Sequence, residues 1–111
     1  ARARVLHDVE PLMKIGTMMG SAAIMVINEE TDLVRLLLRI TKFYAHESCG
    51  QCTPCRVGTA KAVTLMEQPK WDLALLADLS SVMRDASICG LGQAAPNPMD
   101  CVIKYFPHEL A

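Results

Sequence analysis

The 111-residue sequence has no long apolar run and almost no excess of charge of either sign. Its most compact apolar stretch, residues 22–27, is far shorter than the roughly 20 residues that span a bilayer, so no membrane insertion is expected. The formal net charge is −1, which provides no positive field for nucleic acid or for an anionic membrane. The composition therefore argues against both kinds of partner.

The sequence also lacks features of secreted proteins and of hydrolytic enzymes. Two arginines lie within the first four residues, but no apolar segment and cleavage site follow them, as a secretory signal requires. No Ser/His/Asp grouping, carboxylate pair or phosphate-binding glycine loop stands out. We therefore expect a reducing, cytoplasmic compartment and no catalytic residues in this chain. Because the chain begins at Ala1 rather than at methionine, we expect it to be a piece of a longer polypeptide.

Apolar residues recur at helical spacing in four segments after residue 30. Capping or helix-breaking residues bound these segments: Thr31 or Asp32 precedes the first, Pro69 follows the second and Pro107 follows the fourth. The expected helices cover residues 31–47, 56–68, 71–86 and 96–106. The expected inner face of the first helix is Leu33, Leu36, Leu37, Ile40 and Tyr44, and that of the second is Gly58, Ala60 and Ala62. The expected inner face of the third is Leu75, Leu79, Val82 and Ala86, and that of the fourth is Met99, Val102, Ile103 and Phe106. Four amphipathic helices with short connections predict a mainly α fold, a four-helix bundle.

The first 30 residues do not share this helical pattern. Residues 1–20 are predicted as a loop, with a short element near residues 5–9. Residues 21–28 form a compact apolar run bounded by a glycine and an asparagine, which predicts a buried strand. A single strand is not stable without partners, so we expect its partners to lie upstream. We therefore assign residues 1–30 to the end of an upstream domain and residues 31–111 to a helical domain.

The placement of the cysteines indicates a specific chemistry. Cys49, Cys52 and Cys55 form a C-x2-C-x2-C segment, and Cys89 follows in a second loop after 33 intervening residues. Gaps of two residues let one loop place three sulfurs around a corner of an iron–sulfur cube, and the second loop offers the fourth ligand. Gly50 suits the tight turn that such a loop needs. We therefore predict one [4Fe–4S] cluster on these four thiolates, in a chain that transfers electrons.

Zinc is an alternative for the same cysteines. Structural zinc sites usually combine two C-x2-C pairs, or one pair with histidines, whereas here one segment offers three ligands and the other offers one. That division matches a cube better, but a zinc-stabilised interaction module without a redox role stays open as an alternative. A free-standing carrier similar to ferredoxin is a third interpretation.

Three further residues carry weaker predictions. Cys101 lies on the apolar side of the last expected helix and is predicted to fill the core. His46 precedes Cys49 by three residues and is expected to pack or hydrogen-bond near the loop rather than to bind iron. Arg56 follows the third cysteine, where its charge either offsets the electron-rich cluster or is solvated at the start of a helix.

The two cysteine segments together resemble one family. They read E-S-C-G-Q-C-T-P-C-R at residues 47–56 and S-I-C-G-L-G at residues 87–92. Both are similar to the C-terminal part of the NADH-oxidising flavoprotein subunit of respiratory complex I. The same module occurs in the diaphorase subunits of NAD-reducing hydrogenases and in the beta subunits of NAD-dependent formate dehydrogenases. The likeness begins near Gly20 and covers nearly the whole chain.

The resemblance implies a β-grasp-like upstream domain that ends in the strand at residues 21–28, followed by a helical bundle with the cluster. It implies that an upstream domain of the same polypeptide binds FMN and NAD(H). Electrons then pass between the flavin, this cluster and further iron–sulfur centres in partner subunits. It also implies the same four cysteines as ligands, and it places Gly90 and Leu91 towards the flavin.

Two departures from the complex I pattern favour another branch of this family. The gap between Cys55 and Cys89 is several residues shorter than expected for complex I. Residues 90–98 look more like the formate dehydrogenase and hydrogenase branch, whose assemblies are soluble. We therefore expect the electron-transfer module of an NAD-dependent formate dehydrogenase or an NAD-reducing hydrogenase, with the complex I flavoprotein subunit as the alternative.

Overall fold

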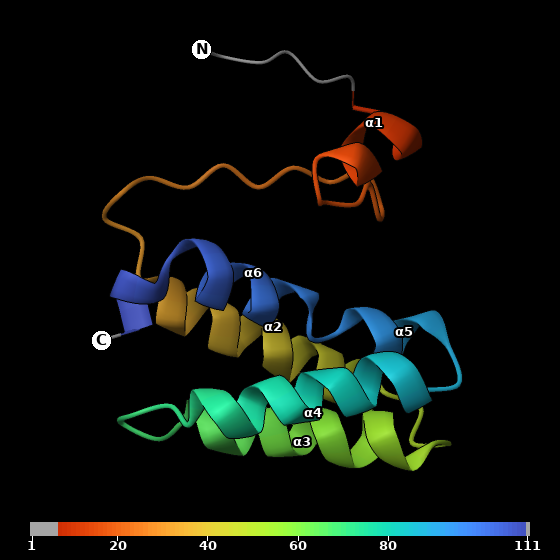
Figure 1. Ribbon diagram of the computed structural model, residues 1–111. Helices are drawn as coiled ribbons and strands as arrows, with labels where there is room; N and C mark the ends of the chain where they lie inside the picture. Colours follow the sequence, from red (N-terminus) through yellow and green to blue (C-terminus); the bar gives the residue numbers. More distant parts are fainter. Residues whose placement is uncertain (1–6, 111) are drawn as a thin grey trace.

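The protein is mainly helical, as the hydrophobic spacing predicts (Figure 1). The computed structural model describes residues 7–110, and within them no segment pairs as a β-strand. None of the helices in this part of the chain is long and apolar enough to cross a bilayer. In order, the elements are α1 (Val9–Lys14), α2 (Leu33–Glu47), α3 (Thr53–Met66), α4 (Leu73–Ala86), α5 (Gly90–Ala94), α6 (Asn97–Tyr105) and a closing 3-10 turn, η1 (Pro107–Leu110).

Aspartate side chains set the starts of the two best-predicted helices. Asp32 caps α2, because its carboxylate accepts hydrogen bonds from the backbone N–H groups of Val34 and Arg35 at 3.1 and 3.3 Å. Asp72 caps α4 in the same way and accepts from the N–H of Leu75 at 3.1 Å. Both helices begin and end close to their predicted boundaries.

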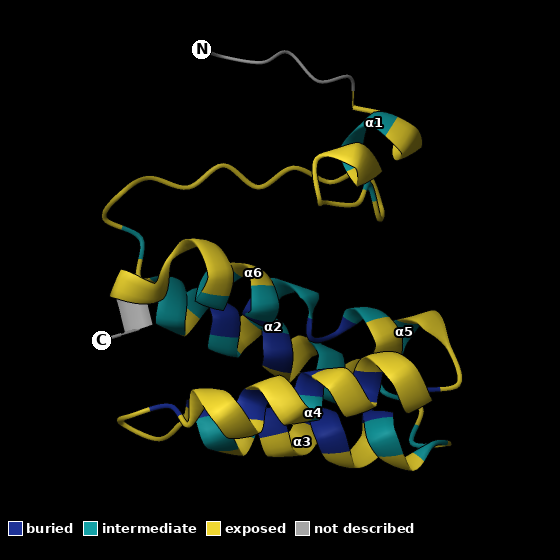
Figure 2. Cartoon of the chain, viewed as in Figure 1, coloured by how far each residue is buried: buried dark blue, intermediate teal, exposed yellow. Residues whose placement is uncertain are grey.

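The core lies where α2, α3, α4 and α6 meet, and Figure 2 shows its buried residues on their facing sides. Trp71 is 9% exposed just before α4, and its indole N–H donates to the carbonyl oxygen of Met66 at 3.0 Å. This bond satisfies the polar end of a large apolar ring, so that the ring can be buried without an unpaired donor. The buried core cluster comprises Leu37, Met66, Trp71, Leu76 and Met99.

Helices α3 and α4 approach each other closely at Gly58. A Cβ on this buried glycine would lie 2.7 Å from Cγ and 2.8 Å from Sδ of Met83, closer than Cβ contacts come in real proteins. The small inner face predicted for α3 is confirmed at Gly58 and Ala62, whereas Ala60 is exposed. Glycine allows this close packing, and a larger residue would require the flexible Met83 side chain to move.

The inner face predicted for α4 is wrong by one position. Leu76, Ser80 and Met83 are buried, whereas the expected Leu75 and Val82 are 40% and 52% exposed. The reason is Ser80, which donates to Asp100 Oδ2 of α6 at 2.6 Å and is therefore satisfied inside the fold. Arg84 completes this link, because its guanidinium donates to Ser80 Oγ at 3.1 Å and to the Asp100 carboxylate at 2.5 Å.

The strand predicted at residues 21–28 is not formed. This segment is exposed throughout, with Val26 at 89%, and it forms no β-strand pairing with any of the described residues. Ala22 even adopts a left-handed φ of 65°, which interrupts a regular strand. The physical reason is that a strand needs a neighbour for its N–H and C=O groups, and none of the described residues supplies one.

The first 20 residues differ from the predicted loop, because α1 forms after Asp8. The Asp8 carboxylate accepts from the N–H of Val9 at 2.7 Å and so begins this short helix. The short element expected near residues 5–9 lies partly outside the described residues. Figure 1 shows α1 apart from the packed helices, joined to α2 by an extended segment.

A test of the packing compares two neighbouring leucines of α4. Leu76 is fully buried, so Leu76→Ala removes apolar contacts and leaves a cavity, and the free energy of unfolding should fall by about 2–5 kcal/mol. The matched control Leu75→Ala sits on the outer side and should change it by about 0.5 kcal/mol or less. Urea unfolding followed by circular dichroism measures both. Equal losses in the two variants would contradict the observed face of α4.

Candidate metal centre

The three-cysteine segment occupies the turn between α2 and α3. Cys49 is exposed just after α2, and Gly50 makes the turn with a left-handed φ of 78°. Cys52 is the N-cap residue of α3, and Cys55 lies in its first turn and is 5% exposed. The helix therefore begins at Thr53, three residues earlier than predicted, and the positive end of its dipole lies beside the thiols.

Arg56 holds this turn in shape. Its guanidinium donates to the carbonyl oxygen of Gly50 at 2.5 Å and to Thr53 Oγ1 at 3.4 Å. Arg56 is exposed at the start of α3, as a solvated arginine would be, and its side chain also folds back on the cysteine turn. Its positive charge thus lies beside the segment that carries three thiols.

The hydroxyl of Ser48 lies against the buried cysteine. Ser48 Oγ is 3.2 Å from Cys55 Sγ, within hydrogen-bonding distance for sulfur. The same oxygen accepts a hydrogen bond from the backbone N–H of Gly50 at 3.3 Å. Since that contact uses an oxygen lone pair, the hydroxyl hydrogen is available for the sulfur of Cys55.

The second cysteine segment packs directly on the first. Cys89 is exposed at the N-cap of α5, a short helix that the sequence did not predict because of its two glycines. A Cβ on Gly92 would lie 2.6 Å from Cβ of Ser87 and 2.9 Å from Cβ of Cys55. Cys55 in α3 and Ser87 at the end of α4 are therefore neighbours through Gly92. The fold brings the two predicted segments together.

Groups from both cysteine segments affect the pKa of the Cys52 thiol. The backbone amide of Ile88 does most to lower the pKa of this thiol, followed by the amide of Cys55, with a smaller contribution from the charge of Arg56. A lowered pKa favours the thiolate, which is the form that binds metals. The amide next to Cys89 thus stabilises the ligand form of a cysteine from the other segment.

The remaining predicted residues lie at different depths. Gly90 is exposed, and apart from its chain neighbours and its own helix backbone no described atom lies within 4 Å of where its Cβ would be. Leu91 is half-buried, and His46 is exposed. Cys101 is exposed on α6, so its prediction as a core filler is wrong. Met99 and Val102 carry the packing on that helix instead.

Among residues 7–110, no three His, Cys, Asp or Glu side chains are gathered as ligands of a metal ion. A single zinc ion needs ligands that converge on one point. The cysteines of a four-iron cluster bind different iron atoms and need not converge so tightly.

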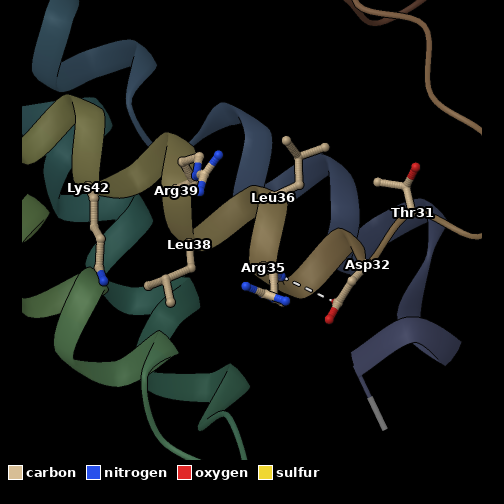
Figure 3. Close-up of a pocket in the computed structure, with 7 residues that line it drawn as sticks. All are labelled: Thr31, Asp32, Arg35, Leu36, Leu38, Arg39 and Lys42. Atoms are coloured by element: carbon tan, nitrogen blue, oxygen red, sulfur yellow. Dashed lines mark hydrogen bonds between the residues drawn. The ribbon is translucent and has the colours of Figure 1, made fainter.

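An open pocket of about 590 Å³ lies on α2 (Figure 3). All its lining residues fall within positions 31–42, before the last turn of the helix that leads to the cysteines. Lys42 at its edge pairs with Glu67 at 3.2 Å. The pocket therefore does not belong to the cysteine centre.

Comparison with known proteins identifies the family. Residues 35–111 match the family described as the NADH-ubiquinone oxidoreductase-F iron-sulfur binding region. The chain belongs to this family. The match contains both cysteine segments and nearly all of the helical part of the chain from α2 onward. The family resemblance found in the sequence is confirmed, and with it the expectation of an iron–sulfur cofactor.

Individual relatives agree with this family. The chain is 38% identical to one of the NADH-quinone oxidoreductase subunits of Rhizobium meliloti, over 95% of this chain and 26% of that protein. It is 39% identical to the mitochondrial NADH dehydrogenase [ubiquinone] flavoprotein 1 of Dictyostelium discoideum, over 96% of this chain and 23% of that protein. The chain thus spans about a quarter of the length of these relatives.

One solved structure shares the fold of this chain. It is the NAD+-reducing [NiFe]-hydrogenase in the H2-reduced state, 40% identical with a TM-score of 0.73. The alignment covers 78% of this chain and 16% of that one. NADH oxidoreductase subunits and a hydrogenase therefore both resemble the chain, at similar identity.

The residues of the centre suit a sulfur-rich cofactor. Ser87 is 6% exposed, and its hydroxyl oxygen is buried without a hydrogen-bond partner among the described residues. An unpaired buried hydroxyl beside Cys55 is unusual in a folded protein, and a bound group with acceptor atoms would satisfy it. The hydroxyl of Ser48 and the amide of Ile88 are further donors near the cysteine sulfurs.

Sequence reasoning found the cysteines but missed the residues that support them. Ser48 and Ser87 each lie within two residues of a cysteine, yet serine is common in turns and carries no distinctive pattern. The position of Gly92, three residues after Cys89, could have drawn attention to it, but in the sequence this glycine indicates only the end of a helical pattern. Its contact with Cys55 depends on the fold.

Gly92 gives a direct test of the contact between the segments. In Gly92→Ala the new methyl group would meet Ser87 and Cys55, and relief requires backbone movement, so the free energy of unfolding should fall by about 1–3 kcal/mol. In the control Gly90→Ala the methyl group meets open space, and the change should stay within about 0.5 kcal/mol. Thermal and urea unfolding measure both. Tolerance of Gly92→Ala would contradict the close packing.

Proposed function

We propose that this chain is the electron-transfer module of an NADH-linked flavoprotein oxidoreductase, built around one [4Fe–4S] cluster on Cys49, Cys52, Cys55 and Cys89. When bound, such a cluster supplies one-electron transfer. The observation that supports the proposal most strongly is the packing of Gly92 against Cys55, because it joins the two segments that carry the four cysteines. Membership of an iron–sulfur binding family supports the same cofactor.

The chain's own residues would prepare the ligands in three ways. The backbone amides of Ile88 and Cys55 lower the pKa of the Cys52 thiol and so favour its thiolate. Arg56 fixes the turn through the Gly50 carbonyl and adds a positive charge near the electron-rich group. Burial of Cys55 limits solvent access to one ligand, which is among the properties that set a cluster's potential.

We further propose that α2, α3, α4 and α6 act as a four-helix bundle that carries the cluster within residues 31–111. Residues 1–30 then belong to the end of a β-grasp-like upstream domain, whose sheet would pair with the extended segment at residues 22–27. The exposure of four successive apolar side chains there supports this assignment: Ile24, Met25, Val26 and Ile27 are 73%, 72%, 89% and 44% exposed. FMN and NAD(H) would bind upstream, with Gly90 and Leu91 towards the flavin.

The parent assembly is proposed at the level of the class. The relatives named above support a complex I flavoprotein subunit and an NAD-reducing hydrogenase about equally. The formate dehydrogenase assignment and the cytoplasmic location stay predictions from the sequence. In each case the electron partners would be further iron–sulfur centres in other subunits.

Two cysteine variants test the ligand set. Cys89→Ala removes a proposed ligand and should lose or convert the cluster, with iron and acid-labile sulfide falling well below the roughly four of each per chain expected for [4Fe–4S] in the anaerobically purified parent protein. Cys101→Ala is the matched control, since Cys101 is exposed on α6 and should leave both contents unchanged. Comparable cluster loss in both variants would contradict Cys89 as the fourth ligand.

The same analysis separates the zinc alternative. A zinc-stabilised interaction module would be colourless, would contain zinc and would yield no acid-labile sulfide. A parent protein without iron and sulfide at these positions would overturn the electron-transfer proposal.

A further inference from the structure

The hydroxyl of Ser87 is buried, and no contact among the described residues satisfies it. Ser87 follows α4 as its C-cap residue, and its side chain is buried. Its backbone is satisfied, because its N–H donates to the carbonyl of Met83 at 3.2 Å and its carbonyl accepts from Gln93 Nε2 at 3.1 Å. Only the side-chain oxygen has no partner among the described residues. Burial of an unpaired hydroxyl destabilises a fold unless something satisfies it.

The position of Ser87 points to the cysteine centre. A Cβ on Gly92 would lie 2.6 Å from Cβ of Ser87 and 2.9 Å from Cβ of Cys55, so these two residues are close neighbours beside that glycine. The absence of a side chain at Gly92 keeps the space between them clear. Ser87 is therefore a neighbour of Cys55 in space, and it precedes Cys89 by two residues in the sequence.

A second hydroxyl already contacts Cys55. Ser48 Oγ lies 3.2 Å from Cys55 Sγ and accepts from the N–H of Gly50, which leaves its hydrogen available for the sulfur. A metal-bound cysteine is a thiolate and can only accept, so in the loaded protein Ser48 must be the donor in this contact.

We propose that Ser87 is a positioning residue whose hydroxyl donates a hydrogen bond to the sulfur shell of the cluster held by Cys55 and Cys89, while Ser48 donates to the Cys55 thiolate. The inference rests on the proposed function, because it requires a cluster at this centre. It assigns a role in setting the reduction potential to two serines that do not bind iron.

The physical effect has a defined sign. Reduction adds one negative charge to the cluster and its sulfurs, and a hydrogen-bond donor stabilises the more negative form more strongly. The donor therefore raises the reduction potential. Removal of the hydroxyl should make the cluster harder to reduce, without removal of any ligand.

The experiment uses the full-length parent polypeptide, purified anaerobically with its cluster. In Ser87→Ala we expect iron and sulfide contents equal to those of the unmodified protein and an equilibrium constant for cluster reduction lower by about tenfold, equivalent to about 59 mV for one electron. A redox titration followed by electron paramagnetic resonance measures the midpoint potential. Ser48→Ala should shift it in the same direction, and the double variant should shift it further.

Two further variants control for packing and for cluster loss. Ser81→Ala is the matched substitution on the exposed side of α4 and should leave the potential unchanged. Ser87→Thr keeps the hydroxyl and should restore the potential. If Ser87→Ala loses the cluster, retention by Ser87→Thr supports the hydrogen bond, whereas loss in both variants overturns it.

The outcomes separate this inference from the proposed function. A cluster-loaded Ser87→Ala protein with an unchanged potential would overturn the role of Ser87 alone and leave the electron-transfer proposal standing. An unmodified parent protein without iron and acid-labile sulfide would instead overturn the proposed function, and this inference with it.

Discussion

The close contact of Gly92 with Cys55 and Ser87 is the constraint on which the cysteine centre depends. Helices α3 and α4 pack together with Gly58 against Met83, and Ser87, just after α4, lies near Cys55 in the first turn of α3. Because Gly92 has no side chain, the turn that contains Cys89 can pack directly against the segment that contains Cys55. Gly92 therefore controls how closely the two segments approach, because a larger residue there would meet the Cβ atoms of Ser87 and Cys55.

Much of the helical core could be predicted because its signals are local. Asp32 and Asp72 cap helices through bonds that span only a few residues, so the sequence contains the whole interaction. The inner face of α4 could not be predicted, because Ser80 is buried only through its bond to Asp100 on a distant helix. The prediction of a strand at residues 21–28 was wrong for a related reason, since pairing requires a neighbour that the described residues do not contain.

The same distinction between local and long-range interactions applies to the candidate metal centre. The cysteine spacing is a local pattern that is typical of an iron–sulfur site, and it points to four residues without any structure. Ser87 and Gly92 act through contacts between α3, α4 and α5, which sequence patterns do not report. Arg56 is an intermediate case, because its proximity to Cys55 is visible in the sequence while its bond to Gly50 is not.

The burial of Trp71 has a practical consequence for work on this protein. It is the chain's single tryptophan, and its indole is held in the core by the bond to Met66. It belongs to the cluster of Leu37 and Leu76 rather than to the cysteine turns. Its intrinsic fluorescence therefore reports on the integrity of the helical core, so an optical signal can distinguish global unfolding from a local rearrangement of the turns.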